Sequence, residues 1–188
     1  MRKLIVFLAA LLLAGCSGLN YSQTFIQDYK SRTIAVLPID TGASAESVGV
    51  IDKVIAEALS SRGFEKVVTA ASLKSQVEAN PELKSTCDGY ISKLKAVSYS
   101  DPDLSSRMGR ICGVESFLLC NVDQWSYVVE NEDKLARVGL SLRLIDARTG
   151  KDVWTSAHSL SEKYVLLKPE LSDVARKLAG KMLSDMPR

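Results

Sequence analysis

Four cysteines and one histidine are the side chains of this 188-residue chain best suited to covalent or metal chemistry. They are Cys16, Cys87, Cys112, Cys120 and His158. Zinc sites are usually built from three or four Cys and His side chains at short spacings, and redox-active thiols usually occur as Cys-x-x-Cys. The sequence has neither pattern. We therefore expect no metal site and no cofactor.

Hydrolytic catalysis would have to depend on His158. The chain has no Gly-x-Ser-x-Gly turn and no glycine-rich phosphate loop. Carboxylates near the ends of secondary-structure elements usually cap helices and close turns. Five aspartates have such positions here: Asp40, Asp101, Asp103, Asp123 and Asp146. These observations favour a protein that is not an enzyme and has no catalytic residue, and a hydrolase that uses His158 is an alternative.

The first sixteen residues have the pattern of an export signal. Arg2 and Lys3 precede an apolar run over residues 4–13. A membrane-spanning helix needs about 20 apolar residues, so this run fits a secretory signal peptide instead. The run ends in Leu-Ala-Gly-Cys, and these four residues, which end at Cys16, resemble the bacterial lipobox. An ordinary signal peptide with an incidental cysteine is the alternative.

The lipobox resemblance implies cleavage before Cys16 and attachment of diacylglycerol and palmitate to this residue. In the lipobox pattern an Asp in the next position favours the inner membrane, so Ser17 implies an outer-membrane lipoprotein that faces the periplasm. Residues 17–32 are polar and predict a tether that reaches about 50 Å when fully extended. Within it, Tyr21, Phe25 and Tyr29 have the spacing of one face of a short helix that packs on the body.

The charge of the exported chain excludes one class of partner. Of 24 Lys and Arg residues, Arg2 and Lys3 belong to the signal, which leaves 22 against 22 Asp and Glu. Nucleic-acid binding requires clustered basic side chains that displace counterions. We therefore expect no nucleic-acid partner.

Export into an oxidising compartment favours disulfide formation. Cys87 lies in one expected helix and Cys112 at the end of the next, so a Cys87–Cys112 bond is the favoured pairing. A Cys112–Cys120 bond is a weaker alternative, because the strand that starts at Ser116 carries Cys120 away from the helix end. Cys120 alternates with Leu118 and Val122 and is expected in the core.

Alternating strand and helix patterns fill the rest of the chain. Strands are expected over residues 33–39, 64–69, 116–125, 134–146 and 151–160, and helices over 44–62, 71–79, 81–97, 101–113 and from 169 onward. This order predicts an α/β fold whose mixed parallel and antiparallel sheet is flanked by helices. The chain should end in an antiparallel three-strand meander and a C-terminal helix.

Three segments resemble one group of periplasmic domains. They are an apolar strand that ends at Pro38, a helix end that leads through Gly113-Val114 into a strand, and Arg-Leu-Ile-Asp-Ala-Arg-Thr-Gly over residues 143–150. Together they are similar to the α/β domain of the curli secretion channel lipoprotein and of the lipoprotein activator of penicillin-binding proteins. The amino-terminal domain of TolB is a looser match. The likeness spans residues 33–185 and implies function through protein contacts.

Two departures limit what this resemblance implies. The penicillin-binding-protein activator reaches through peptidoglycan on a long tether, which residues 17–32 cannot provide. The curli channel builds its pore from long amphipathic hairpins, and no pair of alternating segments is left over here for a membrane barrel. Neither specific activity is therefore expected of this chain.

The sequence predicts a lipoprotein signal over residues 1–15, a lipidated N-terminus and tether over 16–32, and one periplasmic domain over 33–188. Its partners would be the membrane, through the lipid anchor, and an envelope protein. We expect an adaptor or accessory subunit of an assembly, secretion or wall-synthesis machine, and a self-assembling ring of an export conduit is the alternative. Aromatic side chains are common interface anchors, which makes Trp125, Tyr127 and Trp154 interface candidates, although packing in the core is the commoner fate.

Overall fold

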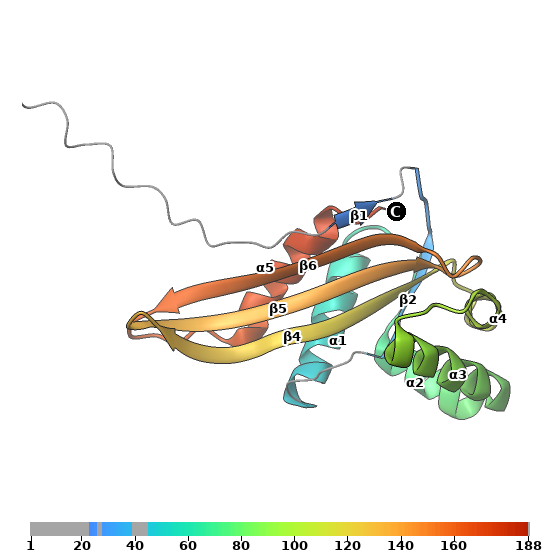
Figure 1. The fold of residues 1–188 in the computed structure, drawn as a ribbon, viewed down its shortest axis with the longest axis horizontal. Helices are drawn as coiled ribbons and strands as arrows, with labels where there is room; N and C mark the ends of the chain where they lie inside the picture. Colours follow the sequence, from blue (N-terminus) through green and yellow to red (C-terminus); the bar gives the residue numbers. More distant parts are fainter. Residues whose placement is uncertain (1–22, 26–27, 39–44, 188) are drawn as a thin grey trace, which may run out of the picture.

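A computed structural model describes residues 23–25, 28–38 and 45–187 of the chain. Over these residues, five helices pack on a six-stranded sheet with the strand order β1-β6-β5-β4-β2-β3 (Figure 1). The strands are β1 (Gln23–Phe25), β2 (Thr33–Val36), β3 (Lys66–Val68), β4 (Ser116–Glu130), β5 (Asp133–Asp146) and β6 (Asp152–Tyr164). The helices are α1 (Ala45–Ser60), α2 (Ala70–Ala79), α3 (Pro81–Val97), α4 (Pro102–Cys112) and α5 (Leu171–Ser184).

The strand pairing confirms the expected fold class. β2 pairs in parallel with β3 and with β4, through connections that contain helices. β4, β5 and β6 then form an antiparallel meander, and α5 follows as the C-terminal helix. The sheet is therefore parallel where helices connect its strands and antiparallel where short turns connect them.

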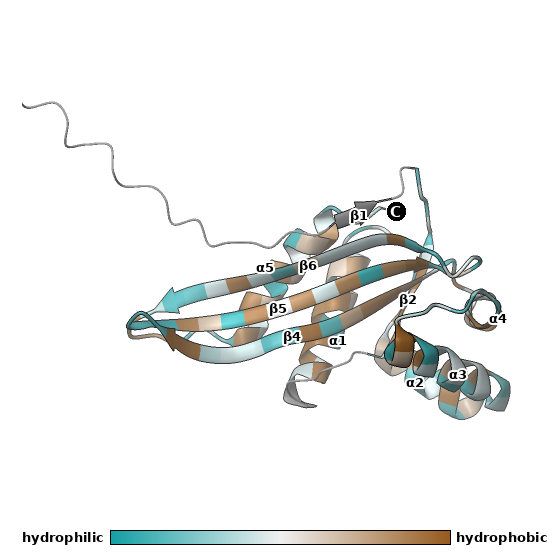
Figure 2. Cartoon of the chain, viewed as in Figure 1, coloured by the Kyte–Doolittle hydropathy of each residue, from teal (hydrophilic) through white to brown (hydrophobic). Residues whose placement is uncertain are grey.

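The helices α1 and α5 cover one face of the sheet. Residues of β5 alternate along the strand, and Val138, Leu140, Leu142 and Leu144 are buried in the cluster formed with these helices. α5 contributes its own apolar stripe, which includes Leu178. Figure 2 shows the alternation of hydrophobic and hydrophilic residues along β4, β5 and β6.

The helices α2, α3 and α4 cover only one end of the opposite face. Their cluster includes Phe117 at the start of β4 and Ile145 at the end of β5. The Tyr90 ring of α3 packs at a tilt on Phe117, with ring centroids 5.7 Å apart. The rest of β4, β5 and β6 extends beyond these helices, so the three strands have one long face that no described helix covers (Figure 1).

Local signals explain where α4 and its neighbouring turn lie. Asp101 caps α4 as expected, because its side chain accepts hydrogen bonds from the backbone N–H of Asp103 at 3.0 Å and of Leu104 at 3.1 Å. Gly150 closes the turn between β5 and β6 with φ +67°, and a Cβ there would lie 3.0 Å from the carbonyl oxygen of Ser100. Glycine is therefore favoured at this position, because it adopts a positive φ without strain and has no Cβ to collide with Ser100.

Part of the segment expected to be a tether belongs to the sheet. β1 lies inside residues 16–32 and pairs antiparallel with β6, with Gln23 opposite Ser156 and Phe25 opposite Trp154. The helix suggested by the aromatic spacing is therefore wrong over residues 23–25. Tyr29 does pack against the core beside α1 and α5, and its hydroxyl donates to the carbonyl oxygen of Glu115 at 3.3 Å. The folded body thus begins earlier than residue 33.

Candidate interaction surface

Cys16, the expected lipidation site, lies outside the described residues, as do the apolar signal segment and Asp40. Among the helices that the structure describes, none combines the length and the apolar composition that a membrane span requires. Attachment to a membrane through Cys16 therefore remains a prediction from the sequence.

The three aromatic interface candidates lie mostly in the core. Trp154 has no exposed surface and belongs to the cluster under α1 and α5, so its assignment to a surface is wrong. Trp125 is half-buried and packs against the same cluster. Tyr127 is also half-buried, and its hydroxyl donates to the carbonyl oxygen of Pro169 at 2.9 Å. These side chains hold the sheet to α5 and to the segment before it.

The uncovered face of β4, β5 and β6 is polar and carries many small side chains. On this face Arg137 donates to both carboxylate oxygens of Glu130 at 2.6 Å and, through Nε, to the Ser161 hydroxyl at 2.8 Å. The Arg137 guanidinium lowers the pKa of Glu130 by hydrogen bonding to its carboxylate. Small residues on the same face are Gly139, Ser141, Ala157, Ser159 and Ser161. A partner backbone can therefore approach the strands closely here.

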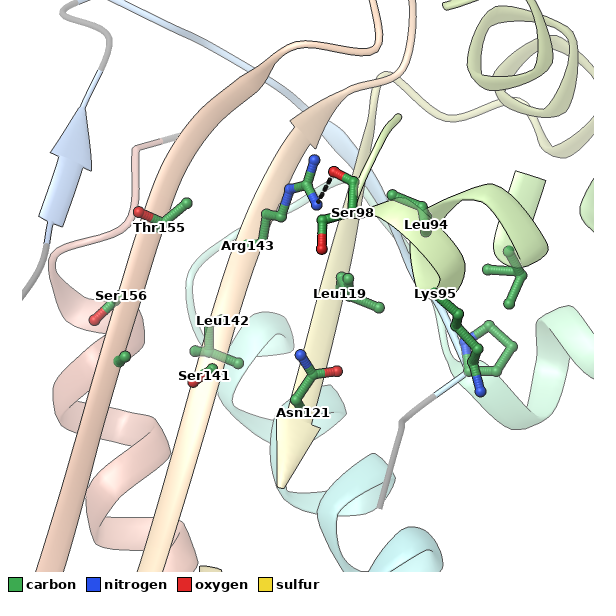
Figure 3. A pocket seen from close by; sticks show the side chains of 13 residues that line it. Leu94, Lys95, Ser98, Leu119, Asn121, Ser141, Leu142, Arg143, Thr155 and Ser156 are labelled. Atoms are coloured by element: carbon green, nitrogen blue, oxygen red, sulfur yellow. Dashed lines mark hydrogen bonds between the residues drawn. The ribbon is translucent and has the colours of Figure 1, made fainter. Parts of the chain in front are cut away.

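A cavity of about 500 Å³ lies where α3 meets this face (Figure 3). Leu94 and Leu119 form part of its apolar lining, and Asn121, Ser141 and Arg143 bring polar groups to it. Arg143 donates through Nη1 to the carbonyl oxygen of Ser98 at 3.2 Å and pairs with Asp152. Its guanidinium is thus already engaged within the chain. Lys95 brings a second cationic side chain to the lining, so the cavity combines apolar, polar and basic groups.

A second cavity of about 550 Å³ lies between α1, α2 and α3. Its lining includes Val48, Leu73 and Ile91. Asp52 at its edge accepts hydrogen bonds from the backbone N–H of Ala70 at 3.0 Å and of Ala71 at 3.1 Å, at the start of α2. This carboxylate therefore caps a helix and is not held ready for a ligand.

Apolar side chains are exposed at the end of the long strands that lies away from α2–α4. Val129, Val165, Leu166 and Leu167 are 69%, 75%, 93% and 89% exposed, and we call these four residues the apolar tip. The strand register brings them together, because Val129 pairs with Lys134, which in turn pairs with Tyr164. The sequence pattern gave no signal for this tip, since short apolar runs in loops resemble buried segments.

The thiols are buried. Cys87 on α3 and Cys112 on α4 belong to one cluster and are 5% and 3% exposed, and Cys120 is buried under α1 and α5 as expected. All three are free thiols in the structure, so the Cys87–Cys112 bond stays a prediction. Burial raises the pKa of Cys87 to about 11, with further contributions from the neighbouring Asp88 and Cys112.

His158 lies on the side of β6 that faces α5. Burial lowers its pKa, and the Lys181 ammonium acts in the same direction, while Asp185 opposes them. Among the described residues, no three His, Cys, Asp or Glu side chains are grouped as metal ligands would be. Two of the other aspartates have structural partners: Asp123 accepts from the Ser141 hydroxyl, and Asp146 accepts from the Thr149 N–H at 2.7 Å. Asp103 lies in the first turn of α4, where a negative charge favours the helix.

No protein-family model and no curated protein matches the sequence. Solved structures do match. The PelC dodecamer from Paraburkholderia phytofirmans is 18% identical with a TM-score of 0.59, over 89% of this chain and 98% of that chain. Lipoprotein GNA1162 from Neisseria meningitidis is 19% identical with a TM-score of 0.55, over 82% and 99%. At this identity the likeness shows the fold alone, and it confirms the expected α/β fold.

Proposed function

We infer that this chain is a lipid-anchored protein of the bacterial outer membrane that faces the periplasm and acts by binding other proteins. It would serve as an adaptor or accessory subunit of an envelope assembly, secretion or wall-synthesis machine. The observation that carries this proposal is the uncovered face of β4, β5 and β6. The helices α1 and α5 pack on the opposite face and bury most of it, whereas this face leaves small and paired polar side chains accessible along three long strands.

The chemistry of the face suits protein contact. Its ion pairs, such as Arg137 with Glu130, are satisfied within the chain, so a partner need not neutralise a buried charge. Non-obligate interfaces are about as polar as other protein surfaces and use shape complementarity, which small side chains permit. Fold similarity to a bacterial lipoprotein is consistent with the proposed location in the envelope.

A second candidate function is a closed ring of identical copies. The fold similarity to PelC, which forms a dodecamer, favours this candidate. In a ring the contacts are head to tail, so the uncovered face of one copy would meet a different surface of the next. Both candidates use the same face and differ in the partner.

The native mass of the lipidated protein, extracted from its own membrane in mild detergent, separates the two. A single copy bound to a different protein would support the adaptor, and a closed oligomer of several copies would support the ring. Ser159→Arg places a long charged side chain on the uncovered face and should release the partner in either case. Ser85→Arg, at an exposed position on α3, is the matched control and should leave the complex intact. Retention of the complex by Ser159→Arg would contradict the proposal.

A further inference from the structure

We propose that the apolar tip inserts into the surface of the lipid bilayer that holds the acyl chains of Cys16. This inference rests on the proposed lipid anchor and adds a second contact with the same membrane. The bilayer itself would cover the tip. The three long strands would then stand between the lipid surface and the helices α2, α3 and α4.

Exposure of apolar side chains is concentrated at this end of the molecule. Six large hydrophobic side chains are exposed among the described residues, and four of them form the tip. Val165, Leu166 and Leu167 are consecutive, so the loop between β6 and α5 presents an unbroken apolar segment. Soluble proteins seldom expose contiguous apolar residues without a binding role.

The length of chain before β1 limits how far the anchor can lie from the tip. Seven peptide steps separate Cys16 from Gln23, and they reach at most about 24 Å. Gln23 pairs with Ser156, and Tyr164 lies eight residues farther along β6, which corresponds to about 26 Å of strand. Because β1 runs antiparallel to β6, the N-terminal end of β1 points along β6 towards the tip. The anchor and the tip can therefore reach one lipid surface.

The side chains around the tip suit the boundary between lipid and water. Tyr127 and Tyr164 pack edge to face with centroids 6.1 Å apart, and the Lys168 ammonium lies 3.4 Å from the centroid of the Tyr127 ring. Tyrosine and lysine are favoured at this boundary, where rings meet the headgroups and long cationic side chains reach the phosphates.

The acidic groups at this end do not oppose such contact strongly. Glu130 is paired with Arg137, and Asp133 is paired with Lys163 at 2.6 Å. Glu132 is exposed in the turn between β4 and β5, and Lys134, two residues later, is exposed as well. The charges near the tip are therefore balanced, and the apolar side chains determine what it binds.

The shape of the tip favours a bilayer over a second protein. A stable protein interface buries about 800 Å² on each partner. The tip is one loop and one strand end with four exposed apolar side chains, which is a small contact. A bilayer requires no complementary shape, and each apolar side chain that enters it is stabilised independently.

The test uses the full lipidated protein in vesicles of phosphatidylethanolamine and phosphatidylglycerol. Leu166→Cys, labelled with an environment-sensitive dye, is compared with Val97→Cys, another exposed apolar position, at the end of α3. Wild-type protein controls for labelling of the buried native thiols. We expect a blue-shifted emission and quenching by nitroxide-labelled lipids at position 166, and neither at position 97.

Three results would overturn the proposal, and they are distinguishable. A vesicle-bound, acylated protein whose dye at position 166 stays in water would show that the tip does not touch lipid, with the anchor intact. A blue-shifted dye that lipid nitroxides do not quench would show that protein, such as a second copy, covers the tip. An N-terminal peptide whose mass lacks acyl chains would remove the anchor on which both proposals depend.

Discussion

Gly109 lies at a close contact between α4 and the turn that joins β5 to β6. A Cβ at this position would lie 2.8 Å from the Cβ of Ala147 and 3.1 Å from the carbonyl oxygen of Val114. Ala147 is buried, so neither side can move away easily. We expect Gly109→Ala to lower the free energy of unfolding by about 1–3 kcal/mol, measured by urea denaturation.

Gly180 provides the matched control for this substitution. It lies on the exposed face of α5, and a Cβ there would have no atom within 4 Å. Alanine favours a helix interior over glycine, so Gly180→Ala should raise stability by about 0.5–1 kcal/mol. Equal shifts for the two variants would show that contact with Ala147 is not the cause.

The predicted bond between Cys87 and Cys112 can be tested on exported protein. Both thiols are buried in one cluster on the neighbouring helices α3 and α4. A bond would close a loop of about 25 residues and add about 3 kcal/mol of stability. Denaturation and alkylation without reductant should then modify Cys120 and leave the other two protected. Alkylation of all three would show that the bond is absent.

The reduced protein should lose stability at alkaline pH. Burial raises the pKa of Cys87 from 9.0 to about 11 in the folded state, so the folded chain holds a proton that the unfolded chain releases first. This contribution is complete below pH 9 and falls as the pH rises to about 11. Urea midpoints across this window should fall less steeply for Cys87→Ala. If the urea midpoints of wild type and Cys87→Ala fall equally steeply with pH, Cys87 is not the group that causes the loss of stability.

At the scale of elements, Asp101 decides where α4 begins. Its side chain caps the helix and also pairs with Lys93 of α3. Asp101→Ala should cost about 0.5–2 kcal/mol in thermal or urea unfolding, because two backbone N–H groups lose their acceptor. Asp101→Asn keeps a capping oxygen and removes only the charge, so it should cost less. Equal losses would assign the effect to the ion pair.

Elements with strong local signals were predictable from the sequence. Pro81 begins α3 as expected, and alternation of apolar residues defines β5 almost to its observed ends. β1 has only three residues, and its pairing with β6 connects segments more than 120 residues apart, so no local pattern predicts it. The side chains that form the cavities likewise come together only through the packing of α3.

A β-bulge explains on which side of β4 Trp125 and Tyr127 lie. The register of β4 against β5 shifts between Val122 and Gln124. A bulge changes which side of the strand the following residues face. Val122, Trp125 and Tyr127 therefore all pack on the cluster under α1 and α5, although simple alternation would separate them. Burial of Trp154 has a different cause, because it lies where α5 already covers β6.

At the scale of the whole molecule, the two edges of the sheet differ in how much unpaired strand they expose. β3 is a three-residue edge strand, and β1 covers only residues 154–156 of β6. Within the described part of the chain, residues 157–164 of β6 have no strand partner on this side. Exposed strand edges present unpaired backbone groups that can pair with another chain. β1 therefore limits how much of β6 is available for such pairing.

Removing β1 tests this protective role. A deletion of residues 17–27 takes away the strand and keeps Cys16, whereas a deletion of residues 17–22 shortens the same segment and retains β1. We expect the longer deletion to form larger, heterogeneous assemblies in sedimentation velocity, because the β6 edge then opens over residues 154–156 as well. The shorter deletion should keep the native mass. Heterogeneous assemblies from both variants would assign the effect to the length of the segment after Cys16, and native mass from both would show that β1 does not protect the edge.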